Sequence, residues 1–371
     1  MKQLKVGIIG QGRSGRDIHG KCLVNMPEKY KIVAVTDALE SRRERAKAEY
    51  GCNVYADYHD MIANEELDIV VNSTFSHMHI PVTIDLLKNG QNVLCEKPFA
   101  RKASDVDEAI KVAEETGKKL FVFQQSRFAP YFQKVKEIIN SGDIGRVVQI
   151  SVAFNGFARR WDWQTIQDYM AGNLLNTGPH PMDQVLDLYG GDVNDMPEIM
   201  CIMDRANTFG DAEDYVKILM RGEGHPVIDV EISSCCAYPS FTYNVQGTRG
   251  GIKASQQKVE WKFFKEEECQ PQQLIKEPLC KEDGTPAYCG EKITWYENSW
   301  DAEKDPAPAT AAYSNAGVGN LFNTIAARYY EGMYEALVND ADFEVKLWQV
   351  RRQVAVIEEC HRQNPLSKSV K

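Results

Sequence analysis

The chain has 371 residues, of which 43% are hydrophobic and 26% are charged, and its formal net charge is -10. Because one hydrophobic core rarely grows beyond roughly 250–300 residues, we expect two domains. The negative charge argues against a nucleic-acid partner, and no apolar run reaches the ~18 residues of a membrane span, so neither nucleic acid nor a membrane is expected. The start runs directly into a strand-like segment without room for a signal peptide, which favours the cytoplasm. The ten cysteines lack Cys-x-x-Cys pairing and are expected to be free thiols.

The first third alternates short apolar runs with helical patterns, which is typical of a parallel sheet wrapped by helices. The expected strands are 5–9, 32–36, 69–73, 93–95 and 120–123, and the expected helices are 15–25, 41–50, 81–88 and 104–115. Ser41 and Ser104 stand where N-caps are expected, and Gly51, Gly90 and Gly117 where helices end. The pattern predicts a doubly wound α/β domain over residues 1–124.

From about residue 146 the chain changes to longer runs with period-two alternation. These runs cover 147–154, 215–220, 226–233, 241–246 and 259–264, and they predict a mostly antiparallel sheet with one covered face. The polar, proline-rich stretch 270–312 is expected to form loops and short edge pieces at an oligomer contact or a pocket rim. Helical patterns at 320–338 and 343–362 close the chain. We therefore predict an α+β domain over residues 125–371 that serves substrate binding and oligomerisation.

The first expected strand is followed by the glycine motif Gly10-x-Gly12-Arg13-Ser14-Gly15. Glycines at this spacing allow a tight turn, a close approach of the backbone to a pyrophosphate, and contact between helix and strand. The helix start that follows offers amide donors to phosphate groups. The motif predicts a Rossmann dinucleotide site, with a purely structural turn as the alternative.

Asp37 ends the second expected strand, 22 residues beyond Gly15. A carboxylate at this place accepts hydrogen bonds from the adenosine ribose and repels a 2'-phosphate, so the sequence favours NAD over NADP. The nearby Arg42 and Arg43 weaken that discrimination. A helix-capping aspartate is the alternative.

Two further segments follow later strands, at the sheet edge where open α/β sheets bind ligands. Residues 72–79 read Asn-Ser-Thr-Phe-Ser-His-Met-His, and residues 95–99 read Cys-Glu-Lys-Pro-Phe. With the glycine motif and Asp37, they resemble the Gfo/Idh/MocA oxidoreductase family, of which Glu-Lys-Pro is the most specific mark. The resemblance continues through residues 127–130, 141–145 and 172–183 and spans the whole chain.

The resemblance implies that Lys97 lies by the nicotinamide and the substrate hydroxyl as general base. Burial and the positive charge of an oxidised nicotinamide both lower the pKa of an ammonium, which prepares it for proton transfer. The alternative is a surface lysine before a turn. The neighbouring residues that the resemblance places at the cofactor are Ser73, Thr74, His79 and Glu96.

The family motif Asp-x-x-x-His-x-x-Asp reads Asn176-x-x-x-His180-x-x-Asp183 in this chain. These spacings place the three side chains on one helical face or its entry turn. The resemblance implies a proton-transfer role for His180 and a substrate or structural role for Asp183, while a buried, hydrogen-bonded histidine is the alternative. Asn176 departs from the motif, because an amide orients an imidazole but cannot stabilise its charged form. This departure favours Lys97 as the base.

The loop Arg159-Arg160-Trp161-Asp162-Trp163 precedes that motif and suits sugar stacking and hydroxyl recognition. We expect Arg160 and Trp163 to contact substrate, with core packing as the alternative, and Arg127 to contact it as well. His77 and His79 are spaced like a metal pair, but no carboxylate completes a ligand set, so no metal is expected.

The resemblance implies reversible hydride transfer between NAD and a secondary hydroxyl of a sugar, inositol or glycoside, in a homo-oligomer (dimer, tetramer or hexamer). The Arg-Trp loop looks most like members that oxidise the sugar ring of glycosides to keto-glycosides. An NAD-dependent glycosidase, acting by transient oxidation and elimination without net NADH, is a second possibility. A non-catalytic sensor is a third, against which both Lys97 and His180 argue.

Overall fold

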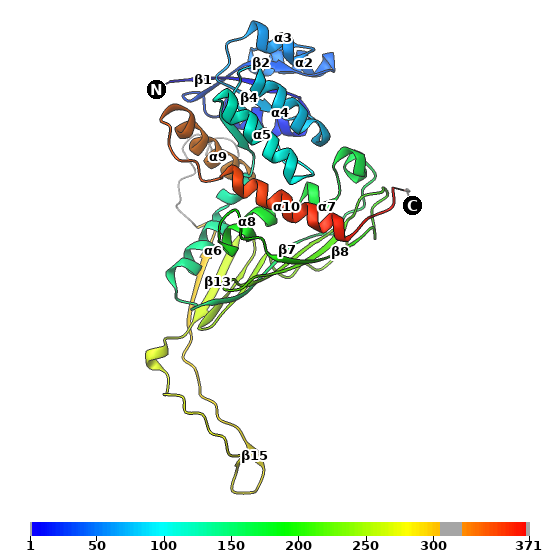
Figure 1. The fold of residues 1–371 in the computed structure, drawn as a ribbon. Helices are drawn as coiled ribbons and strands as arrows, with labels where there is room; N and C mark the ends of the chain where they lie inside the picture. Colours follow the sequence, from blue (N-terminus) through cyan, green and yellow to red (C-terminus); the bar gives the residue numbers. More distant parts are fainter. Residues whose placement is uncertain (1, 305–320, 369–371) are drawn as a thin grey trace.

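The structure, a computed structural model, describes residues 2–304 and 321–368 (Figure 1). Its first part contains a six-stranded, entirely parallel sheet with strand order β3-β2-β1-β4-β5-β6, as the sequence predicts. The strands are β1 (Leu4–Ile9), β2 (Tyr30–Thr36), β3 (Asn53–Tyr55), β4 (Ile69–Asn72), β5 (Val93–Cys95) and β6 (Leu120–Val122). The sequence analysis missed β3, because three residues of mixed polarity are too short to show a period.

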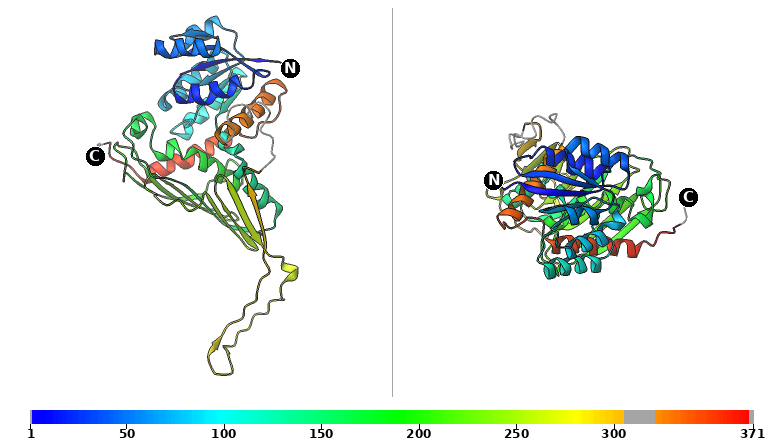
Figure 2. Two further views of the ribbon diagram at one scale, coloured as in Figure 1. Left: turned by 180° about the vertical axis from the view of Figure 1, so that it is seen from behind. Right: turned by 90° about the horizontal axis from the view of Figure 1, so that it is seen from above.

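Helices cover both faces of this sheet, which the view from above shows edge-on between them (Figure 2). The helical segments are η1 (Arg13–Gly20), α1 (Lys21–Val24), α2 (Glu40–Tyr50), α3 (Tyr58–Asn64), α4 (His79–Lys88) and α5 (Ala103–Thr116). Gly51 and Gly117 end α2 and α5 with φ near +64° and +63°, as predicted. The predicted N-caps are wrong: Ser41 and Ser104 lie in the first turn, one residue inside helices that begin earlier.

The second part is built on an eight-stranded sheet with strand order β16-β13-β12-β11-β7-β10-β9-β8. Only β7 and β10 pair in parallel, so the sheet is mostly antiparallel, as predicted. In β10, Ile228, Val230 and Ile232 are buried and alternate with the more exposed Asp229 and Glu231, which is the pattern of a sheet with one covered face. The strands are β7 (Val147–Asn155), β8 (Glu198–Asp204), β9 (Tyr215–Arg221), β10 (Val227–Ser233), β11 (Tyr243–Gly247), β12 (Gly250–Ala254), β13 (Lys258–Phe263) and β16 (Tyr296–Asp301).

The covered face of this sheet packs against α6 (Pro130–Ser141), α8 (Pro179–Tyr189) and α10 (Leu347–Gln363) (Figure 1). In contrast, α9 (Leu321–Val338) returns to the parallel sheet, where Tyr329 and Tyr330 join its hydrophobic core. The last third of the chain therefore contributes to both cores. The division at residue 124 stays a prediction, to which the structure adds α9 as a part of the first core.

Between β13 and β16 the chain leaves the body as a long, extended hairpin, the yellow segment at the lower end of Figure 1. Besides the one-turn helix η6 (Glu266–Glu268), this arm (residues 264–295) contains the short pair β14 (Leu279–Cys280) and β15 (Pro286–Ala287). Leu274 and Tyr288 are highly exposed on it. The expected loops and edge pieces of 270–312 are thus present up to residue 304, while 305–312 lie outside the described residues.

Within residues 2–304 and 321–368, no helix is long and apolar enough to cross a membrane. All ten cysteines lie in these ranges, and none of them forms a disulfide there.

Candidate active site

The glycine loop after β1 forms a cradle that side chains would block. Gly10 has φ +90°, and a Cβ on it would lie 2.6 Å from the carbonyl oxygen of Ser73. A Cβ on Gly15 would lie 1.8 Å from the carbonyl oxygen of Gly10, so the turn closes only with glycine at both places. At Gly12, by contrast, a Cβ would meet nothing nearer than Arg42 at 4.0 Å. This open space above the loop fits the pyrophosphate of a dinucleotide.

Asp37 lies beside this loop and is 8% exposed. Its Oδ2 accepts a hydrogen bond from the backbone N–H of Gln11 at 2.7 Å, and its Oδ1 accepts one from Leu39 at 2.9 Å. Arg42 approaches the same carboxylate at 3.4 Å, while Arg43 donates to the carbonyl oxygens of Asp37 and Ala38. Asp37 therefore also braces the glycine loop, a role that the spacing of residues does not reveal.

The turn after β4 is held by hydrogen bonds from its own polar residues. Ser73 Oγ donates to the carbonyl of Ile9 at 2.7 Å, and Thr74 Oγ1 donates to Asn72 Oδ1 at 2.7 Å. His79 is buried, which lowers its pKa, and its ring nitrogens lie 2.7 Å from the carbonyl oxygen of Pro98 and 3.1 Å from that of Thr74. His79 thereby joins the β4 turn to the turn that carries Lys97.

Glu96 is buried directly before Lys97. Burial opposes its ionisation, but the hydrogen bond and charge of His19 outweigh burial and lower the pKa of Glu96 to about 2. His19 Nε2 lies 3.1 Å from Oε1 of Glu96, and Nδ1 lies 2.7 Å from the hydroxyl of Tyr330. Oε2 of Glu96 accepts a hydrogen bond from the backbone N–H of Lys97 at 3.0 Å, which fixes the lysine backbone. Sequence reasoning missed His19 and Tyr330, which no motif marks.

Lys97 connects the two parts of the molecule. Its Nζ donates a hydrogen bond to the carbonyl oxygen of Asn176 in α7 (Asn173–Asn176) at 2.8 Å. Burial lowers the pKa of Lys97, and the positive charge of Arg13 lowers it further, while Glu96 opposes the shift. An ammonium with these surroundings gives up its proton more readily than a lysine in water, as a general base requires.

The side chains of the second motif do not form a dyad. Asn176 Oδ1 accepts a hydrogen bond from Gln164 Nε2 at 3.3 Å and none from His180. His180 Nδ1 is buried without a hydrogen-bond partner in the described part of the chain. Burial, together with the charge of Lys97, lowers the pKa of His180 to about 3, so the imidazole is neutral near pH 7. A neutral ring with a free nitrogen is suited to hydrogen bonding a substrate hydroxyl.

Arg127 and Asp183 face each other in the interior, at 1% and 2% exposure. Arg127 Nε and Nη2 bind the two carboxylate oxygens of Asp183 at 2.9 and 2.7 Å, and Nη1 reaches Asp187 at 3.0 Å. Burial raises the pKa of Asp183, and the adjacent guanidinium opposes that shift. This geometry joins η3 (Gln125–Phe128) to α8 and supports a structural role for both residues in place of the expected substrate contact.

The expected substrate loop lies against the first domain through aromatic rings. Trp163 meets Phe75 edge-on at 5.1 Å between ring centroids, and Tyr169 contacts Phe75 at 6.1 Å and His77 at 5.0 Å. Arg160 pairs with Asp162 at 2.8 Å. Two hydrogen-bonded links join the cluster to the surroundings of Lys97. His79 connects Thr74, the residue before Phe75, to Pro98, and Gln164, the residue after Trp163, donates to Asn176. Sequence analysis missed Tyr169 and gave Phe75 no role within the segment 72–79, since single aromatic residues in loops carry no pattern.

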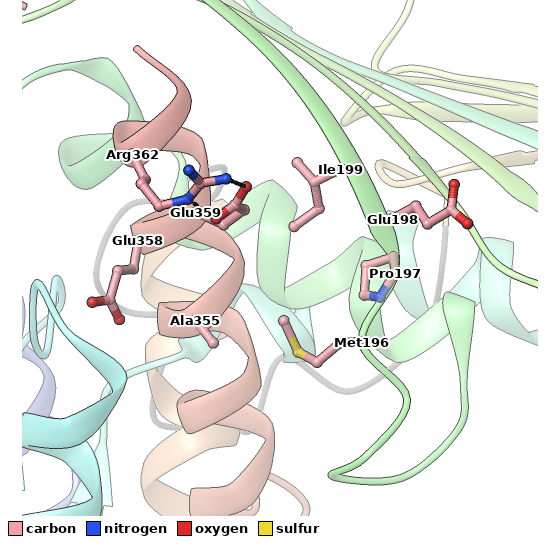
Figure 3. A pocket seen from close by; sticks show the side chains of 8 residues that line it. All are labelled: Met196, Pro197, Glu198, Ile199, Ala355, Glu358, Glu359 and Arg362. Atoms are coloured by element: carbon pink, nitrogen blue, oxygen red, sulfur yellow. Dashed lines mark hydrogen bonds and ion pairs between the residues drawn. The ribbon is translucent and has the colours of Figure 1, made fainter. Parts of the chain in front are cut away.

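Two hollows lie away from the cofactor loop. One, of about 520 Å³, separates the start of β8 from α10 and is lined by the paired Glu359 and Arg362 and by apolar residues such as Met196 and Ile199 (Figure 3). None of the predicted site residues lines it. The other, of about 600 Å³, borders α7, the helix that receives Lys97.

The parallel sheet with its glycine loop, together with a half-buried lysine at the junction to a second domain, defines a dinucleotide-dependent oxidoreductase. The family model described as "Oxidoreductase family, NAD-binding Rossmann fold" matches residues 4–124. The model of the "GFO/IDH/MocA C-terminal domain" matches residues 132–253. The chain therefore belongs to the Gfo/Idh/MocA family of NAD-dependent, sugar-related oxidoreductases, and its cofactor is NAD.

Several relatives are similar to this chain. A 2,7-anhydro-N-acetylneuraminate hydratase of Mediterraneibacter gnavus is 28% identical over 68% of this chain and 67% of its own length. An inositol 2-dehydrogenase of Salmonella typhimurium is 30% identical over 45% of this chain and 48% of its own. Among solved structures, the WlbA dehydrogenase of Bordetella pertussis in complex with NADH and UDP-GlcNAcA covers 98% of this chain and 95% of its own, at 20% identity and a TM-score of 0.75. That likeness shows the fold.

Proposed function

We propose that the protein transfers a hydride between NAD and a secondary hydroxyl of a sugar-like substrate, with Lys97 as general base. The single observation that carries this proposal is the position of Lys97, half-buried with a lowered pKa and with its Nζ 2.8 Å from the carbonyl oxygen of Asn176. In this arrangement residues 1–124 hold the cofactor and residues 125–371 supply most of the substrate pocket. The cofactor contacts proposed are Gly10, Gly12, Arg13, Ser14, Gly15, Asp37, Ser73, Thr74, His79, Glu96 and Lys97.

NAD held at the glycine loop and Asp37 would supply the acceptor for the hydride that the carbinol C–H bond gives up in the oxidation direction. Lys97 takes the proton of the hydroxyl, so a carbonyl compound and an ammonium result. His180 and Asn176 orient the hydroxyl by neutral hydrogen bonds, and Trp163 and Arg160 line the sugar side of the pocket. Arg127 and Asp183 act at a distance by holding η3 against α8.

A glycoside that is oxidised to a keto-glycoside is the finer assignment that we favour. The inositol 2-dehydrogenase among the relatives is named for a polyhydroxylated ring. The hydratase among the relatives supports the elimination alternative, because neither hydration nor elimination needs a net oxidant. The two functions differ in one observable: a dehydrogenase accumulates NADH in proportion to substrate, whereas transient oxidation and elimination does not. A sensor would do neither.

The deciding experiment incubates the protein with NAD and a panel of free sugars, inositols and glycosides, and follows both NADH absorbance and product by mass spectrometry. We expect net NADH with at least one glycoside. Release of an aglycone without NADH would establish the elimination alternative, and binding without turnover would establish the sensor.

Cofactor preference provides a test of Asp37. We expect NAD(H) to bind at least about tenfold more tightly than NADP(H), because a carboxylate at the ribose repels a 2'-phosphate. Because the same carboxylate accepts from Gln11, Asp37→Asn is the informative variant: it keeps an acceptor for the loop and removes the charge. In fluorescence titrations of both cofactors, we expect Asp37→Asn to bind NADP(H) more tightly than the wild type does. The difference between NAD(H) and NADP(H) affinity should therefore become smaller. Equal affinities in the wild type would remove the role of Asp37 in discrimination.

The variant Asn176→Asp tests whether Lys97 or His180 is the group whose titration produces the alkaline rise of kcat/KM. Because the Lys97 ammonium lies at Asn176, Asn176→Asp is expected to raise the pKa of Lys97 and to move the alkaline rise of kcat/KM to higher pH. His180→Asn should lower kcat without moving that rise, because His180 with a pKa of about 3 is already neutral there. A pH profile of both variants is the measurement. A displaced rise in His180→Asn would return the base role to His180.

The homo-oligomer expected from the sequence remains a proposal. We propose that the arm (residues 264–295) forms the contact between its subunits. Its apolar residues Leu274 and Tyr288 are 82% and 92% exposed among the residues that the structure describes. We expect a chain in which residues 266–294 are replaced by a short Gly-Ser linker to have a lower molar mass in light scattering than the wild type. An unchanged mass would assign the arm another use.

A further inference from the structure

The hollow beside α7 has a clear boundary made by the ends of several strands. It lies where β7 and β10 end and is closed by the loop before β11 and the turn between β12 and β13. Its volume of about 600 Å³ falls in the range of pockets for small organic ligands. The residues lining it are Ala153, Phe154, Asn155, Gly156, Phe157, Ala158, Asn173, Thr177, Ile232, Ser233, Ser234, Pro239, Ser240, Phe241, Thr242, Ser255, Gln256 and Gln257. We refer to it as the α7 groove.

The α7 groove adjoins the reaction centre. Asn173 and Thr177 line it from the same short helical stretch that presents Asn176 to Lys97. Asn173 Nδ2 is fixed by the carbonyl of Asp214 at 2.7 Å and by Ser234 Oγ at 2.9 Å, so this wall of the groove is rigidly joined to β10. Because Thr177 follows Asn176 directly, the groove begins one residue from the carbonyl that receives Lys97.

The chemistry of the lining narrows the class of occupant. None of the eighteen lining residues is Asp, Glu, Lys or Arg. A pyrophosphate or a carboxylate buried here would lack a cationic partner and would lose its hydration without compensation. The lining instead combines the rings of Phe154, Phe157 and Phe241 with hydroxyl and amide groups. Phe157 keeps 62% of its surface exposed, which leaves a ring face free for stacking.

We propose that the α7 groove binds the neutral, aromatic aglycone of a glycoside whose sugar ring reacts at Lys97. The inference rests on the proposed function and adds its substrate class. An aromatic ring of the aglycone stacks on the phenylalanine rings, and its polar substituents meet the serine, threonine and asparagine side chains. Charged leaving groups, such as a nucleoside diphosphate, are excluded by the uncharged lining.

Binding measurements keep this inference separate from turnover. Phenyl and methyl glycosides of the same sugar and anomer, and the corresponding UDP-sugar, are titrated by calorimetry into the protein saturated with NADH. We expect the phenyl glycoside to bind about tenfold more tightly than the methyl glycoside, the scale of a well-formed ring contact, and the UDP-sugar to bind more weakly than the phenyl glycoside. Equal affinities for phenyl and methyl glycosides, or preference for the UDP-sugar, would overturn the inference. Absence of NADH formation with all glycosides, despite preferential phenyl binding, would instead overturn the proposed function.

Two phenylalanines of similar exposure provide a matched comparison. Phe157→Ala removes a ring from the groove, while Phe209→Ala removes a ring that is 60% exposed and does not line it. We expect Phe157→Ala to weaken phenyl glycoside binding about tenfold and to leave methyl glycoside binding unchanged, with Phe209→Ala like the wild type. Phe157→Leu, which keeps apolar volume, should lose most of the same preference and guards against misfolding of the alanine variant. Equal effects of the Phe157 and Phe209 variants would refute the assignment of the groove.

Discussion

Lys97→Ala is expected to lower kcat by roughly 10²–10⁴-fold, the scale for losing a positioned acid–base group. NAD affinity should change far less, because the glycine loop and Asp37 remain in place. The sign of the pH dependence follows from the lowered pKa of Lys97. The base acts in its neutral form, so activity is lost as pH falls through that pKa, and the rise lies below the pH at which an ordinary lysine titrates. In Lys97→Ala this rise should be absent.

The measurement is single-turnover hydride transfer at 340 nm across pH, beside a titration of NAD binding. Lys97→Arg is a sharp companion, since a guanidinium keeps the positive charge but does not deprotonate in proteins. It should be as inactive as the alanine variant. The matched control is Lys111→Ala, because Lys111 is exposed on α5 and contacts only Glu115 among its ion-pair partners in the described residues. Near-normal turnover in Lys97→Ala would show that Lys97 is not the general base, and His180 would then be the next candidate.

Arg127→Met should reduce the free energy of unfolding by about 3–5 kcal/mol, because it leaves the Asp183 carboxylate buried without its partner. Asp183→Leu alone should cost less, because the guanidinium keeps the carboxylate of Asp187 at 3.0 Å. The double variant should lose less free energy of unfolding than the two single variants lose together, because neither charge of the pair remains. Urea denaturation of the four proteins without cofactor measures this cycle.

The surface pair Arg362–Glu359, whose side chains are 72% and 30% exposed, is the control for the buried pair. Its removal should change stability by at most about 1 kcal/mol, because solvent screens exposed ion pairs. If the Arg127 and Asp183 variants are as stable as the wild type but raise KM, both residues belong to the substrate site, as the sequence first indicated.

The parts of the site that depend on short stretches of chain were predictable from the sequence. The glycine loop, Asp37 and Lys97 each follow a strand by a short, regular spacing, and the parallel order of the strands brings these ends to one edge. The alternation in β9 and β10 likewise predicts a sheet with one covered face, because side chains of a strand point alternately to its two faces. These features require only local periodicity and the turn chemistry of glycine.

Contacts between distant segments were decided by the tertiary structure alone. Glu96 is held by His19, and His19 by Tyr330 of α9, which lies 311 residues further along the chain. The sequence placed Arg127 at the substrate and left Asp183 a substrate or a structural role, while the packing of η3 on α8 pairs the two side chains with each other. No single-chain pattern encodes such pairs, because burial depends on which elements meet in space. For the same reason the α7 groove emerges only once the ends of β7 and β10 lie beside α7.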